Sequence, residues 1–170
     1  MDWVKQQHFG GVEVSWVYTL YRFQRKVYPN AKMDVDSSAQ PWLSPEWSEM
    51  MAYTKQYCDS IGLGCDFTFG SGWPFGASYV LKEDGSKIYG DTTFEQLIHF
   101  SWEYPTYGRV INHLKKEALW RYAMPLGRGL REALKGSTSA LLCESWEIKL
   151  NGSNKLWTDG FDKKFEQRFG

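Results

Sequence analysis

The sequence predicts an α/β fold in which parallel strands alternate with helices, as part of a (β/α)8 barrel. Short apolar strands alternate with longer helical segments, an order that is typical of parallel sheets built from right-handed crossovers. A complete barrel needs about 250 residues, whereas this chain has 170 and opens on a helix. No G-x-G-x-x-G turn follows a strand, which disfavours the alternative of an open doubly wound sheet.

The first half of the chain is expected to contain a helix end, two strands and one long helix. These elements lie over residues 2–8, about 11–18, 44–61 and about 65–69. In the first strand, valines alternate with Glu13 and Ser15, which places these two side chains on the opposite face. Ser44 as N-cap and Pro45 at the first helical position mark the start of the long helix, and glycines follow its end.

The second half is less regular, although we expect residues 1–170 to form one domain. An irregular insertion is expected over about 76–110, with 78–81 and 87–90 as the short strands of a hairpin. A long helix should start at Val110 and be kinked or divided at Pro125. Three elements follow: a strand over about 139–146, a polar loop over 151–157 and a final helix capped by Thr158 or Asp159.

Composition argues against several classes of protein. Twenty basic and twenty acidic side chains cancel, so no charge excess points to nucleic acid or to an anionic membrane. No segment is long and apolar enough to span a bilayer, and no signal peptide is visible in this chain. Cys58, Cys65 and Cys143 cannot all pair with one another, and we expect mostly buried thiols rather than a disulfide framework. The many aromatic residues, nine of them Trp, fit either an aromatic core or a sugar site.

The candidate catalytic residues lie at predicted strand ends, where parallel barrels carry their active sites. Trp16 and Trp73 follow the first two strands, and the third ends in Glu144, Trp146 and Glu147. Glycoside cleavage needs two carboxyl groups, and an apolar neighbour such as Trp146 helps an acid to keep its proton. The alternative is that both glutamates are solvated loop acids or partners of a basic side chain.

Two strand carboxylates, Glu13 and Asp66, are further candidates. Each can pair with a cation inside a barrel, and Glu13 can bind a hard cation such as calcium, although no D-x-D-x-D-G loop occurs. His8, His99 and His113 share no ligand spacing, which disfavours zinc. The absence of a G-x-S-x-G motif disfavours a serine hydrolase.

Several segments together resemble glycoside hydrolase family 106, the α-L-rhamnosidases. These segments are GGVEVSWVY, WLSPEWSEMMAYTKQYCDSIGLGCDFTFGSGWPFG, GRVINHLKKEAL, LLCESWEI and LWTDGFDKKFEQRFG. The resemblance covers most of the chain apart from roughly 76–100. It implies that the chain is the early part of a (β/α)8 catalytic domain, whose first strand lies upstream, in a larger protein with β-sandwich domains. It also implies export to the periplasm or the cell exterior.

The same resemblance implies inverting hydrolysis of terminal α-L-rhamnosides, with calcium at the substrate site. Glu147 matches the family motif and is expected to be the general acid. The family usually has Asp where this chain has Glu144, which leaves the exact role of Glu144 open. The catalytic base is expected beyond Gly170. The remaining candidates are Glu13 for the metal and, for the substrate, Trp16, Asp66, Trp73 and Trp146.

Two other hypotheses stay open at this point. The chain could be a non-catalytic carbohydrate-binding barrel fragment that keeps the aromatic side chains, and a glutamate at the end of a later strand would distinguish the enzyme from the binder. It could also be an unstable gene fragment, because an incomplete barrel leaves strand edges unpaired.

Overall fold

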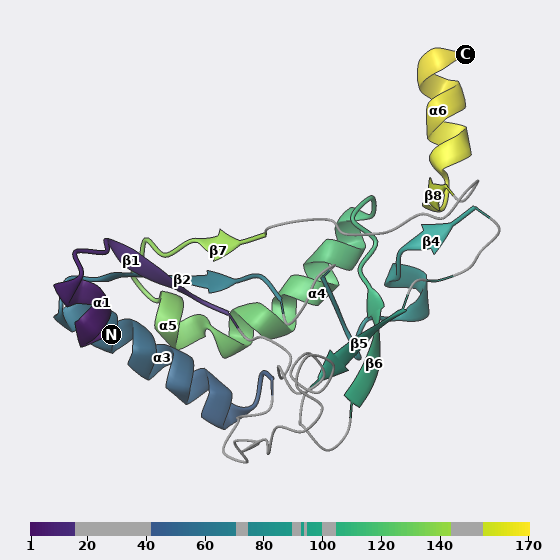
Figure 1. The fold of residues 1–170 in the computed structure, drawn as a ribbon. Coiled ribbons are helices and arrows are strands. Elements are labelled where there is room, and N and C mark those ends of the chain that lie inside the picture. Colours follow the sequence, from purple (N-terminus) through teal and green to yellow (C-terminus); the bar gives the residue numbers. More distant parts are fainter. Residues whose placement is uncertain (16–41, 71–74, 90–92, 94, 100–104, 144–154) are drawn as a thin grey trace, which may run out of the picture.

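The computed structural model describes residues 1–15, 42–70, 75–89, 93, 95–99, 105–143 and 155–170. They form an α/β structure with a three-stranded parallel sheet, a three-stranded antiparallel sheet and a two-stranded ribbon (Figure 1). The predicted α/β class is therefore confirmed. In the described ranges, no helix has both the length and the apolar character needed to cross a membrane.

The parallel sheet consists of the three strands that the sequence predicted. They are β1 (Gly11–Val14), β2 (Gly64–Thr68) and β7 (Leu141–Leu142), in the order β1-β2-β7. Glu13 is opposite Asp66 in the register, and Phe67 is opposite Leu141. The predicted extensions to residues 18 and 146 lie mostly outside the described residues. All three strands run in the same direction, so their carboxyl ends share one edge.

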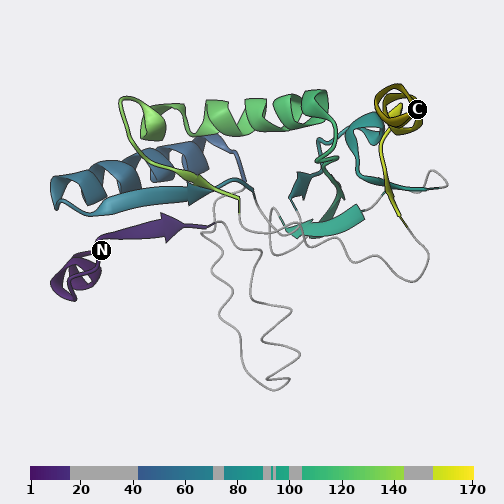
Figure 2. The same cartoon turned by 90° about the horizontal axis from the view of Figure 1, so that it is seen from above.

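Helices cover one face of this sheet and build the main core. They are α3 (Pro45–Ser60), α4 (Lys116–Gly129) and α5 (Arg131–Leu134). Figure 2 shows these helices on the same side of the strands. Cys65 and Phe67 point from β2 into the core, which also contains Trp47 of α3 and Leu126 of α4. Burial of this apolar surface is the main stabilising contribution.

The long helix α3 begins and ends as predicted. The Ser44 hydroxyl accepts a hydrogen bond from the Trp47 amide at 3.1 Å, and Pro45 occupies the first turn. The helix ends at Ser60, and Gly62 follows with φ +67°, a conformation that glycine adopts without strain. Capping is a local interaction, which explains why the sequence predicts this helix well.

The insertion is more regular than predicted. It contains β3 (Gly76–Ala77), β5 (Glu95–His99) and β6 (Pro105–Val110), which pair as an antiparallel sheet in the order β3-β6-β5. The prediction of a hairpin between 78–81 and 87–90 is wrong. Residues 82–84 form the short 3-10 helix η1 (Lys82–Asp84), and β4 (Lys87–Ile88) pairs instead with β8 (Leu156–Trp157).

A buried carboxylate explains why the hairpin is absent. The side chain of Asp84 is only 3 % exposed, and it forms ion pairs with Arg121 of α4 at 2.5 Å and with Lys115 at 3.0 Å. These partners are more than 30 residues away, so a local turn pattern does not reveal them. The ion pairs draw the KED segment inward, against α4, instead of leaving it at the tip of a hairpin.

The second long helix starts later than predicted and is not divided at Pro125. Val110 is the last residue of β6, where it pairs with Gly76, and the helix begins six residues later at Lys116. Pro125 lies inside α4, which continues to Gly129. The interruption instead falls at Leu130, between α4 and α5. Gly136 follows α5 with φ +65°, as expected for a residue that ends a helix.

The two terminal helices are short. The first, α1 (Asp2–Gln6), corresponds to the predicted helix end, and α6 (Phe161–Phe169) projects from the rest of the chain (Figure 1). Gly160, not Thr158 or Asp159, is the N-cap of α6. Both predicted caps have other partners: Thr158 accepts a hydrogen bond from Asn112, and Asp159 pairs with Lys87. The predicted loop over 151–157 ends instead in strand β8.

Candidate functional site

The candidate site lies at the carboxyl ends of β1, β2 and β7, hereafter the carboxyl edge. On β1, Val12 and Val14 pack against the main core. Because side chains alternate along a strand, Glu13 lies on the opposite face, as predicted. The same alternation on β2 places Asp66 and Thr68 on that face. The sheet therefore has one apolar face covered by helices and one face with polar side chains.

Three polar side chains at the carboxyl edge, those of Glu13, Ser15 and Thr68, contact one another. The hydroxyl oxygen of Thr68 lies 2.6 Å from Ser15 Oγ and 3.2 Å from Glu13 Oε1. Ser15 donates a hydrogen bond to the same carboxylate oxygen at 3.1 Å. Thr68 is only 4 % exposed, so its hydroxyl is a fixed support for the exposed Glu13 carboxylate. This group, hereafter the Glu13 cluster, joins the ends of β1 and β2.

Asp66 links β2 to β7. Its Oδ1 accepts a hydrogen bond from the Ala140 amide at 2.7 Å. Nearby, the Ser139 hydroxyl donates to the Cys65 carbonyl oxygen. Both bonds hold the start of β7 against β2 and so set the direction in which β7 leads to the carboxyl edge. A role for Asp66 in substrate binding stays a prediction.

An aromatic cluster supports the loop that leaves β2. Phe69 follows the strand and packs edge-on against Phe75 and Tyr122, with ring centroids 5.9 and 5.6 Å apart. The Tyr122 hydroxyl donates a hydrogen bond to the Phe69 carbonyl oxygen at 3.3 Å. A Cβ atom at Gly70 would lie 2.6 Å from the Tyr122 hydroxyl oxygen, so only glycine fits there. This packing fixes where the glycine-rich segment starts.

Burial controls the protonation of two groups near this cluster. It raises the pKa of the Tyr122 hydroxyl well above its usual value, and neighbouring Tyr79 and Cys143 raise it further. Partial desolvation also raises the pKa of the Cys143 thiol, although this residue, which follows β7 directly, is exposed. Both groups are therefore neutral and protonated at neutral pH. They provide hydrogen-bonding and packing, not charge, beside the carboxyl edge.

The predicted site residues divide into two sets. Glu13 and Asp66 lie on the polar face, opposite each other on adjacent strands. The others lie outside the described residues: Trp16, Trp73, Glu144, Trp146 and Glu147. Cys143 is the last described residue before Glu144. The sequence analysis missed Thr68, although its spacing of two from Asp66, with Phe67 between them, is the alternation that identified Glu13.

The donors at the carboxyl edge fit calcium in chemical type. The Glu13 cluster contains carboxylate and hydroxyl oxygens, which are hard ligands of the kind that calcium binds. Calcium takes about six to eight oxygens, more than this cluster supplies. Within the described ranges, no three His, Cys, Asp or Glu side chains gather into a metal-binding group. Further ligands would have to come from other parts of the protein.

Comparison with models of protein families, with curated proteins and with solved structures finds no match to this chain.

Proposed function

We propose that this chain is part of the catalytic domain of a glycoside hydrolase that cleaves terminal α-L-rhamnosides with inversion. One observation carries the proposal: three adjacent parallel strands end at one edge, and the third leads directly into Glu144 and Glu147. In α/β barrels this edge is where catalytic side chains gather. The sequence resemblance described above supplies the reaction class. The same proposal assigns the remaining strands of a (β/α)8 barrel, and accessory β-sandwich domains, to other parts of the full-length protein.

Glu147 is the proposed general acid. In an inverting reaction the acid protonates the leaving oxygen while a second carboxylate removes a proton from the attacking water. An apolar neighbour such as Trp146, the preceding residue, would favour the protonated form of Glu147. The second carboxylate is proposed to lie about 6.5–9.5 Å away, across the scissile bond, in a later part of the barrel. Glu144 would then contact the substrate or orient Glu147.

The Glu13 cluster is the proposed support for calcium. Glu13, with the hydroxyl oxygens of Ser15 and Thr68, would hold the ion on one side. When bound, the ion supplies positive charge that orients the sugar hydroxyls. The aromatic residues Trp16, Trp73 and Trp146 are proposed to cover the apolar face of the sugar ring. Export to the periplasm or the exterior would bring the protein to its glycan substrates.

The acid role is tested by Glu147→Gln in the natural protein that contains this chain. Removal of a general acid costs about 10²–10⁴-fold in rate. The loss should be large for a rhamnoside with a sugar or alkyl leaving group, which needs protonation. It should be smaller for an aryl rhamnoside, whose leaving group departs more easily. Rhamnose binding, measured by calorimetry, should survive. Glu166→Gln, an exposed glutamate on α6, is the matched control.

Two outcomes would contradict the proposal. Turnover by Glu147→Gln at the rate of the unaltered protein on both substrates would exclude Glu147 as the acid. Rhamnoside binding without turnover by the unaltered protein would indicate the non-catalytic carbohydrate-binding alternative instead.

A further inference from the structure

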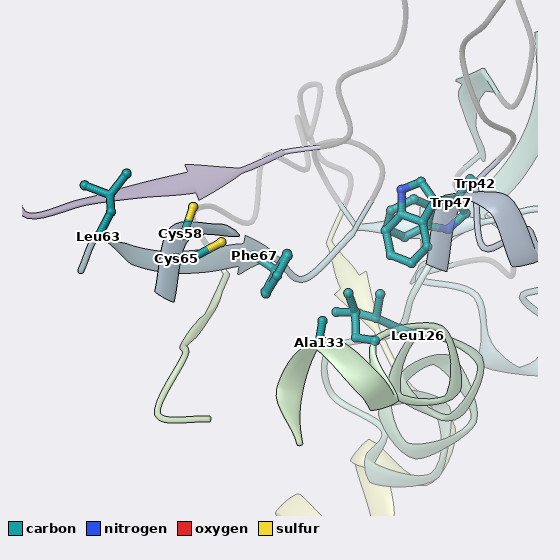
Figure 3. Close-up of a cluster of buried hydrophobic side chains, with 9 residues drawn as sticks. Trp42, Trp47, Cys58, Leu63, Cys65, Phe67, Leu126 and Ala133 are labelled. Atoms are coloured by element: carbon teal, nitrogen blue, oxygen red, sulfur yellow. The ribbon is translucent and has the colours of Figure 1, made fainter. Parts of the chain in front are cut away.

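Two cysteines lie next to each other in the main core, on the helix-covered face of the parallel sheet. Cys58 belongs to the last turn of α3, Cys65 is the second residue of β2, and both are at most 4 % exposed. Figure 3 shows their sulfur atoms close to each other, and the two thiols are near enough for Cys58 to influence the protonation of Cys65. Both are free cysteines in this structure.

The short connection from α3 to β2 enforces this proximity. The Cys58 carbonyl oxygen accepts hydrogen bonds from the Leu63 amide at 2.8 Å and from the Ile61 amide at 3.2 Å. Leu63 precedes Cys65 by only two residues. The chain therefore turns back on Cys58 just before it enters β2. A disulfide needs two cysteines that are close together in the fold, and this turn makes Cys58 and Cys65 neighbours.

We infer that Cys58 and Cys65 form a disulfide bond with each other when the protein folds in an oxidising compartment. One thiol loses its proton, and its thiolate attacks a sulfur of a disulfide oxidant such as oxidised glutathione, which releases one glutathione thiolate. The second cysteine, also deprotonated, attacks the mixed disulfide and releases the other. The protein loses two protons and two electrons, and the oxidant becomes two thiols. This site is independent of the proposed glycosidase activity.

The disulfide bond should form during folding, before the two thiols are buried in the hydrophobic core. Burial, with the neighbouring Cys58 thiol as a further cause, raises the pKa of Cys65 to about 12. The thiolate is the reactive form, so the folded, reduced protein should resist oxidation at this pair. During folding the two thiols are accessible, and the reaction can proceed. Cys143 is exposed and provides an internal comparison, because it can be labelled in the folded protein.

Disulfide mapping by mass spectrometry tests the inference. The purified protein is refolded in a buffer of reduced and oxidised glutathione, its free thiols are blocked, and it is digested without reduction. We expect a peptide that links Cys58 to Cys65, with the mass loss of two hydrogen atoms. Cys143→Ser should retain this link and Cys65→Ala should abolish it. Protein that is folded while reduced should react with a maleimide at Cys143 only, until it is denatured.

The melting temperature provides a second measurement. Reduction should lower it by several degrees in the unaltered protein and in Cys143→Ser, because the cross-link limits the unfolded chain. Reduction should leave Cys65→Ala unchanged. Three free thiols in protein that has refolded to its native circular dichroism spectrum would overturn the inference. A disulfide that joins Cys143 to either buried cysteine would do the same.

Discussion

Thr68 is the residue on which the ends of β1 and β2 depend most directly. Its buried hydroxyl lies against both Ser15 and Glu13. A buried polar group that loses its partner costs more than a satisfied hydrogen bond contributes. The orientation of Glu13 at the carboxyl edge is therefore set by a residue that has no catalytic chemistry of its own.

Thr68→Val tests this role, because valine keeps the shape of threonine and removes the hydroxyl. We expect a loss of about 1 kcal/mol in the free energy of unfolding, measured by urea titration. Thr68→Ser keeps the hydroxyl and should recover most of the hydrogen-bond contribution. Equal stability of Thr68→Val and the unaltered chain would show that the Glu13 cluster does not support the sheet.

Asp84 makes stability depend on pH. The Arg121 guanidinium, with Lys115, lowers the pKa of Asp84 below its ordinary value. A carboxyl group whose folded pKa is depressed stabilises the fold above its unfolded pKa of about 3.9. That stabilisation is lost as the pH falls from about 4 through the lower folded pKa.

Asp84→Asn should therefore destabilise the protein by about 2 kcal/mol at pH 6. The difference from the unaltered chain should shrink below about pH 4. Melting temperatures measured from pH 6 to pH 2 test this, with the exposed Asp162→Asn on α6 as control. A difference that stays constant over that range would show that the Asp84 ion pairs do not cause it.

For single residues, the sequence predicted the side-chain orientations that follow from alternation along a strand. It missed the contacts between residues that lie far apart in the chain. The opposite orientation of Val12 and Glu13 follows from the two-residue period of a strand. The burial of Asp84 does not, because Arg121 lies far along the chain and no local pattern joins the two.

Among the elements, α3 is the one whose limits the sequence fully encodes. The Ser44 cap, the proline in the first turn and the glycine after the last turn are all local signals. The insertion lacks such signals. Its strands β3 and β6 pair across more than 25 residues, and β4 pairs with β8 across nearly 70. For this reason the sequence predicted only an irregular segment there.

Ser44→Ala should remove the cap of α3 and lower the free energy of unfolding by about 1 kcal/mol. The matched control is Ser60→Ala at the other end of the same helix, where the exposed hydroxyl donates only to the Tyr57 carbonyl. Chemical denaturation of both variants makes the comparison. Equal destabilisation by the two substitutions would mean that the cap makes no special contribution.

On the scale of the whole molecule, the parallel sheet is open at both sides among the described residues. There, β1 and β7 each pair only with β2, and Leu141 and Leu142 are 38 % and 40 % exposed. Unpaired strand edges with apolar side chains promote association with other chains. The open edges are compatible with part of a barrel, which remains a proposal because neighbouring strands would have to come from elsewhere in the protein.

We therefore predict that the isolated 170 residues aggregate as their concentration rises. Light scattering after size-exclusion chromatography should detect large species, and Leu141→Lys should reduce them because a charge blocks edge pairing. A soluble monomer with a single sharp thermal transition would show that the open sheet edges are stable in water.

The position of the Glu147 carboxyl group in an experimental structure tests the central claim most directly. We expect it at the same edge of the parallel sheet as Glu13 and Thr68, on the face away from α3. A carboxyl group directed into bulk solvent, distant from the ends of β1 and β2, would exclude an active site at the carboxyl edge.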